Sequence, residues 1–137
     1  MAEALTIKQP WAWAIIEAGK DVENRKQRTR HRGPLFIHAG LQDSLEGWEW
    51  LDEMDIPLPV DPPNGGVVGL VDLVDCAQGY DSRWAMEGHY HWVFDNPESL
   101  PFVPMKGDLF MFDPLARASS KREASWLEEA IRARTSC

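Results

Sequence analysis

The order of its short strand patterns is the feature that most constrains how this chain can fold. Short stretches that read as strands occupy residues 4–8, 21–25, 34–39, 66–76, 89–96 and 107–114, and turn signals separate them. Few helical patterns interrupt them, whereas a doubly wound parallel sheet needs a helix after nearly every strand. The pattern favours an α+β protein built on a small mixed or antiparallel β-barrel of five or six strands, closed or nearly closed and flanked by helices.

Three segments carry helical signals. Pro10 suits the first turn of a helix, and Gly19 suits the left-handed residue that ends one, so we expect a helix between them across one barrel opening. Asp43, with Glu46 three residues later, predicts the start of a second helix. A third helix is expected from about residue 119, where Ser120 and Glu123 have the same spacing.

Composition limits the class of protein. The 137 residues fit a single domain spanning 1–137, and 44% of them are hydrophobic, without a run long enough for a membrane helix. The start of the chain lacks a basic stretch followed by an apolar core, and Cys76 and Cys137 are the only cysteines. We therefore expect a cytoplasmic protein with neither a disulfide framework nor a membrane partner.

Charge is distributed unevenly along the chain. Asp and Glu number 22 against 14 Lys and Arg, yet six basic residues fall between Lys20 and Arg32. In an extended loop, Arg28, Arg30 and Arg32 would point the same way and could contact successive phosphates. The alternative is a solvated loop whose arginines pair with nearby acids. An acidic protein with one basic segment favours a short, single-stranded or nucleotide-sized anion over a long polyanion.

Trp11 and Trp13 cannot both face the core, because two residues on a helix lie about 200° apart around its axis. One of them could stack on a nucleic-acid base, as aromatic side chains do in single-strand binders. The alternative is a partly exposed tryptophan packed against a loop.

Five stretches in order resemble the ASCH domain family: "LTIKQPWAWAI", "GKDVENR", "RGPLFIHAG", "GVVGLVDLVDC" and "MKGDLFMFD". That family is similar in fold to the PUA domains, small barrels associated with RNA. The resemblance covers about residues 5–112 and leaves the helix from about 119 outside the family core. It implies an RNA- or nucleotide-binding cleft beside the barrel, lined by Gln9, Pro10, Trp11, Lys20, Glu23, Arg25, His38 and the basic loop with Arg28, Arg30 and Arg32.

The resemblance also implies a hydrolase as an alternative. Some members resemble ribonucleases, and one branch resembles amidohydrolases that act on N4-acetylcytidine with a lysine, a threonine three residues on, and a carboxylate. Lys20 matches the lysine, but Glu23 stands where the threonine is expected. Lys20 and Glu23 are therefore the candidate catalytic pair, with Asp72 or Asp75 as other acids that could exchange a proton with Lys20.

The spacing of Lys20 and Glu23 leaves their relationship open. On a strictly extended strand they lie on opposite faces, whereas a turn near Gly19 would bring them together. A surface ion pair beside a strand is the alternative to a site.

Metal and cofactor signals are weak. His89 and His91 share a strand face, but the spacing suggests no third ligand, so we expect no metal and no cofactor. Two classes of function remain, a binding module for RNA or a nucleotide, which is the preferred interpretation, and a small hydrolase. A protein-interaction domain, with an acidic partner on the basic loop, is a third.

Overall fold

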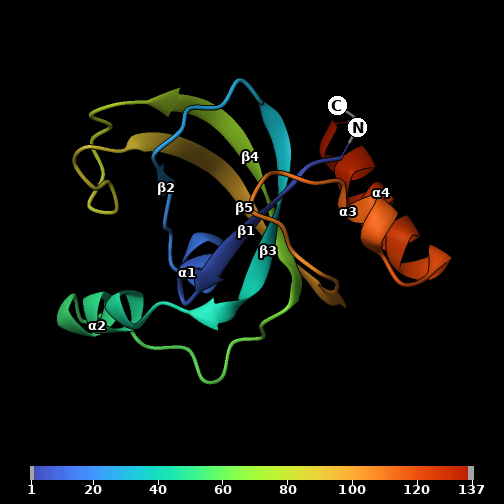
Figure 1. Cartoon of the computed structure of the whole chain (residues 1–137), viewed down its shortest axis with the longest axis horizontal. Helices are drawn as coiled ribbons and strands as arrows, with labels where there is room; N and C mark the ends of the chain where they lie inside the picture. Colours follow the sequence, from blue (N-terminus) through green and yellow to red (C-terminus); the bar gives the residue numbers. More distant parts are fainter. Residues whose placement is uncertain (1, 136–137) are drawn as a thin grey trace.

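The chain folds as an α+β protein around one mixed sheet, as its strand patterns predict (Figure 1). The computed structural model describes residues 2–135, and none of the helices in that range is long and apolar enough to cross a membrane. Its elements in chain order are β1 (Ala4–Gln9), α1 (Trp11–Glu17), β2 (Val22–Arg25), β3 (Gly33–Asp43), α2 (Leu45–Glu53), β4 (Gly66–Ala77), β5 (Tyr90–Pro104), α3 (Pro114–Arg117) and α4 (Lys121–Thr135).

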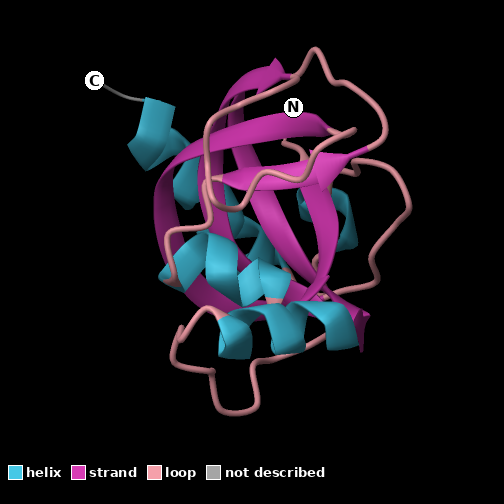
Figure 2. Ribbon diagram, turned by 90° about the vertical axis from the view of Figure 1, so that its left-hand side faces the viewer, coloured by secondary structure: helices cyan, strands magenta, loops and turns pink. Residues whose placement is uncertain are grey.

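The sheet has the strand order β1-β3-β4-β5-β2, with β1 parallel to β3 and all other neighbours antiparallel. It curls strongly on itself (Figures 1 and 2). Across the described range, however, β1 and β2 form no ladder with each other, so the barrel is partial rather than closed. β2 has only four residues, and Phe112 already occupies part of the free edge of β1 by pairing with Ala4.

Helix α1 lies inside the curl of the sheet, where Ala12 and Ile15 join the buried cluster that includes Ile37 (Figure 1). The close approach of α1 to β4 depends on Gly69 of β4, because a Cβ atom there would lie 2.4 Å from Cδ1 of Ile16. Register shifts along the β4–β5 ladder let the two long strands bend around the helix.

Helix α4 covers the outer face of the sheet. Its Leu127 is buried in a second cluster with Phe36, Leu70 and Val103. The middle of β3, residues 35–40, is therefore buried on both faces, which explains the run of apolar residues from Leu35 to Ile37. The C-terminal helix, predicted to lie outside the family core, thus contributes to the packed core of the structure.

The predicted strand at 107–114 is wrong. Only an isolated bridge between Ala4 and Phe112 forms there. A strand would place Phe110 and Phe112 on the same face, but Phe112 is buried and Phe110 is 69% exposed. Asp113 then caps α3, accepting a hydrogen bond from the Leu115 N–H at 3.0 Å. The segment between β5 and α3 consequently crosses the edge of the sheet as an irregular loop.

Helix α2 begins one residue later than predicted. Ser44, not Asp43, is its N-cap, because the Ser44 hydroxyl accepts the Gly47 N–H at 3.0 Å. Asp43 instead ends β3 and accepts a hydrogen bond from the Trp48 indole.

Candidate functional site

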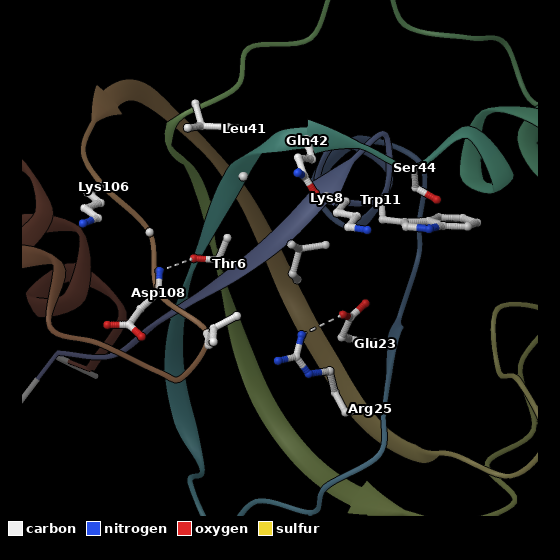
Figure 3. Close-up of a pocket in the computed structure, with 14 residues that line it drawn as sticks. Thr6, Lys8, Trp11, Glu23, Arg25, Leu41, Gln42, Ser44, Lys106 and Asp108 are labelled. Atoms are coloured by element: carbon white, nitrogen blue, oxygen red, sulfur yellow. Dashed lines mark hydrogen bonds and ion pairs between the residues drawn. The ribbon is translucent and has the colours of Figure 1, made fainter.

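A cleft of about 670 Å³ opens along the seam between β1 and β2, the two edge strands of the sheet (Figure 3). This seam cleft lies where a closed barrel would have its last ladder. Its walls come from both edge strands, the end of β3, the start of α1 and the loop after β5. The lining residues are Thr6, Ile7, Lys8, Trp11, Glu23, Arg25, Gly40, Leu41, Gln42, Ser44, Lys106, Gly107, Asp108 and Leu109.

Three cationic side chains line the seam cleft. Arg25 lies beside Glu23, with 3.4 Å between Nη1 and Oε2, and its guanidinium lies over the Trp92 ring. Lys8 and Lys106 are exposed on opposite sides of the cleft (Figure 3), and neither side chain pairs with another residue of the described chain. Two of the three cations are therefore without a counter-ion in the part of the chain that the structure describes, and they are available to an anion.

Lys20 lies beside the cleft, buried to 4% exposure. Its ammonium donates hydrogen bonds to the Val22 carbonyl and, at 3.3 Å, to Oε1 of Glu23, and it lies 5.3 Å from the centre of the Trp11 ring. Burial lowers the pKa of Lys20, and the Glu23 carboxylate opposes that effect. The site thus contains an amine whose charged form is less favoured than on the surface.

A turn at Gly19 explains how Lys20 and Glu23 meet. Gly19 has a φ of +76°, and the N–H groups of Ala18 and Lys20 both bond to the Ala14 carbonyl. This end of α1 holds Lys20 ahead of β2, outside the strict alternation of the strand. The structure therefore has the turn that the sequence left as one of two alternatives.

A second cavity, the aromatic chamber, has a volume of about 330 Å³ and shares Trp11 and Glu23 with the seam cleft. Its tryptophan rings contact one another, with centroid distances of 4.8 Å for Trp50–Trp84, 5.8 Å for Trp11–Trp50 and 6.4 Å for Trp11–Trp84. Lys20 also lines this chamber. The remaining lining residues are Asn24, Glu46, Arg83, Ala85, Met86 and His89.

His38 lies behind the wall of the seam cleft rather than in it, at 1% exposure. Its Nε2–H donates to the Met105 carbonyl at 2.8 Å, so Nδ1 accepts from the Thr6 hydroxyl at 3.2 Å. Burial lowers the pKa of His38, and the positive charge of the nearby Arg117 lowers it further. The hydrogen bond to the Met105 carbonyl has the opposite effect and raises it. A Cβ at Gly107 would lie 2.7 Å from the imidazole, so His38 packs directly under the loop.

Gln9 lies outside both cavities, at 1% exposure. Its amide donates to the Pro63 carbonyl and its oxygen accepts the Trp13 N–H, both at 2.9 Å. Both ends of the Gln9 side chain are thus engaged by backbone groups, which fix the proline-rich loop against α1.

The basic loop continues from Arg25 but does not line either cavity. Arg28 and Arg30 are exposed. Arg32 is exposed too, and it donates to two backbone carbonyls of the loop while lying 3.9 Å from Asp75. The loop is therefore a separate basic surface, next to the end of β2.

Among the acids considered as proton partners of Lys20, Glu23 is the one in contact. Asp72 pairs with Arg134 of α4 at 3.3 Å, and Asp75 lies near Arg32. Neither Asp72 nor Asp75 lines the aromatic chamber.

The two histidines considered as metal ligands, His89 and His91, have different surroundings. His89 lines the aromatic chamber, whereas His91 is buried, accepting the Tyr80 N–H and donating to the Met86 carbonyl. Within residues 2–135, no three His, Cys, Asp or Glu side chains form a group suited to a metal ion. Cys76 is a free thiol, and Cys137 lies outside the described residues.

Sequence reasoning missed Lys8, Lys106, Trp50 and Trp84. Lys8 and Lys106 lie within stretches that carry the family resemblance, but nothing in their spacing links two such distant positions. Trp84 lies in a loop without periodicity. Only the fold brings the two lysines to the seam cleft and the two tryptophans to the aromatic chamber.

The fold and the site together define a small α+β protein with a cationic cleft and an aromatic chamber at the open seam of a partial barrel. The family model described as "ASCH domain" matches residues 5–127, and the chain belongs to the ASCH domain family.

Similar proteins include Activating signal cointegrator 1 of Homo sapiens, 29% identical over 120 residues, and the protein of that name from Mus musculus, 31% identical over 120 residues. Each match covers 76% of this chain but only 21% of the relative. The chain therefore corresponds to a small part of these longer proteins.

Proposed function

We propose that this chain is a binding module that holds RNA or a nucleotide in the seam cleft. The supporting observation is that Lys8 and Lys106 flank one cleft without a counter-ion among residues 2–135, in a protein where acids outnumber basic residues. Lysine ammonium groups at such positions contact phosphate oxygens and fix the ligand without reading its sequence.

The aromatic chamber supports a nucleotide over a simple anion. A volume of about 670 Å³ for the cleft lies within the usual range for small-ligand sites, and the chamber continues from it past Trp11. Phosphate would lie between the lysines, Arg25 would add a third cation, and the base would contact Trp11. Arg28 and Arg30 of the exposed basic loop would extend the contact to a longer strand.

The test is the salt dependence of binding to a fluorescein-labelled single-stranded octauridine RNA, followed by fluorescence anisotropy. Each lost phosphate contact lowers the slope of log Kd against log salt by about 0.7, so the double variant Lys8→Met/Lys106→Met should lower it by about 1.4. Lys121→Met, at an exposed lysine of α4, is the matched control. An unchanged slope in the double variant would refute the proposal.

A hydrolase remains a second candidate because Lys20 is buried, has a lowered pKa and contacts Glu23 beside a cavity. Such a pair can exchange a proton with a substrate. The residues lining the chamber include no serine or threonine, so water or a substrate hydroxyl would have to attack. Hydrolysis of RNA or N4-acetylcytidine that Lys20→Met abolishes would support this function, and full activity of that variant would exclude the assignment.

A further inference from the structure

Apolar side chains are exposed on the rim of the cationic cleft. Leu41 and Leu109 line the cleft although they are 83% and 84% exposed, and Phe110, next in the chain, is 69% exposed. A single exposed leucine needs no explanation, but adjacent large apolar residues beside unpaired lysines indicate a surface with a partner.

Leu109 and Phe110 lie on a segment, residues 106–110, that several hydrogen bonds hold in place. Arg117 donates to the carbonyls of Lys106 and Gly107, at 3.2 Å and 2.9 Å, and to the Asp108 carboxylate at 2.8 Å. The Phe110 N–H in turn bonds to the Asp108 carboxylate at 3.3 Å. A charged fork that bridges three acceptors fixes the loop more strongly than neutral bonds would.

The other side of the same segment is held by β1 and β3. The Asp108 N–H donates to the Thr6 hydroxyl at 3.2 Å, and that hydroxyl also bonds His38, which holds the Met105 carbonyl. Gly107 allows this contact, since a Cβ there would lie 2.6 Å from the Thr6 oxygen. The loop is thus held from both sides, and Phe110 projects from a preorganised support.

We propose that Leu109 and Phe110 form a stacking platform for an unpaired base of single-stranded RNA whose phosphates lie on Lys8 and Lys106. This rests on the proposed function and names the class of RNA. A single strand presents phosphates and planar bases side by side, which matches a cleft lined by two lysines and Leu109, followed directly in the chain by the exposed ring of Phe110. Bases stack on such rings regardless of sequence. A duplex keeps its bases stacked inside and cannot use the platform.

The measurement compares the octauridine strand with a duplex RNA of eight base pairs, each titrated at several salt concentrations. For Phe110→Ala we expect about tenfold weaker binding of the single strand, or about 1.4 kcal/mol, with an unchanged salt slope because no charge is lost. Phe110→Tyr keeps the ring and should bind as the parent does. Val60→Ala, at a 95% exposed residue of the proline-rich loop, is the control for the loss of exposed apolar side-chain atoms.

Each failure has a separate meaning. Lysine-dependent RNA binding that Phe110→Ala leaves within twofold would overturn the platform but not the proposed function. Equal losses for single strand and duplex would also overturn the platform, because stacking on unpaired bases would not be involved. If the parent chain binds neither RNA, the platform and the RNA-binding form of the proposed function are both refuted, and an acidic apolar peptide becomes the partner to test on this rim.

Discussion

Lys20 and Glu23 lie 3.3 Å apart, from Nζ to Oε1, on a chain whose strand alternation alone would separate them. The contact is nearly shielded from water, since the side chains are 3% and 12% exposed. Oε2 of Glu23 also lies 3.4 Å from Nη1 of Arg25. One carboxylate therefore contacts two cations between the seam cleft and the aromatic chamber.

The first prediction concerns the balance of charge at Lys20. Glu23→Gln should lower the pKa of Lys20 further, because burial already lowers it and the Glu23 charge is the main opposing effect. Asp21→Asn is the matched control and should lower the pKa less, since Asp21 makes the smallest of these contributions. NMR titration of the Lys20 side chain measures both, and a pKa that stays constant or rises in Glu23→Gln would contradict the described contact.

The second prediction is a pH dependence that comes from His38. Its folded-state pKa is below 6.5, so the unfolded chain binds the proton more readily. The contribution of neutral His38 to the free energy of unfolding is therefore complete above about pH 6.5 and is lost as the pH falls through the lowered pKa. Denaturant titrations at pH 7.5 and pH 5 should show a smaller difference for His38→Gln than for the parent. An equal difference would mean that His38 does not titrate in this way.

The third prediction concerns Arg117 as a positioning residue. Its guanidinium holds the pKa of Asp108 below the usual range, first through a direct hydrogen bond. Arg117→Lys keeps the charge but loses the planar fork, so the pKa of Asp108 should rise and exchange of the Asp108 amide hydrogen should become faster. Carboxyl NMR titration and hydrogen exchange test this. If neither changes, the loop is held without Arg117.

The fourth prediction concerns the basic loop. Replacing Arg28, Arg30 and Arg32 together with alanine should lower the salt slope for single-stranded RNA by up to about 2, if all three contact phosphates. Arg32 is already engaged with loop carbonyls, so a smaller change of about 1.4 is expected if only Arg28 and Arg30 contact phosphates. A slope and affinity equal to those of the parent would mean that the loop carries only solvated charge.

Local patterns predicted much of the fold. The β-branched run in β4 and the start of α4 after Ser120 depend on nearby residues, and the structure has both. The prediction of a strand at 107–114 was wrong because side chains outside this segment hold the loop around Gly107, namely Arg117 of the following helix and Thr6 and His38 of distant strands.

Less of the candidate site than of the fold could be predicted from the sequence. Trp11, Lys20, Glu23 and Arg25 lie close together in the chain, so a resemblance of short blocks could group them. Lys106, by contrast, reaches the seam cleft only because the loop after β5 crosses to β1, where the Asp108 N–H bonds to the Thr6 hydroxyl. The short strand β2 matches the pattern predicted at 21–25, but no side-chain pattern specifies that it stays unpaired with β1.

The most direct test of the account is an NMR titration of the uniformly ¹⁵N-labelled chain with the octauridine strand. If the seam cleft binds RNA, the largest amide shifts should occur at residues 6–8, 23–25 and 106–110, three segments that only the folded seam brings together. Shifts restricted to other surfaces, such as α4 or the 55–64 loop, or no shifts at saturating RNA, would contradict the claim that this cleft is a nucleic-acid site.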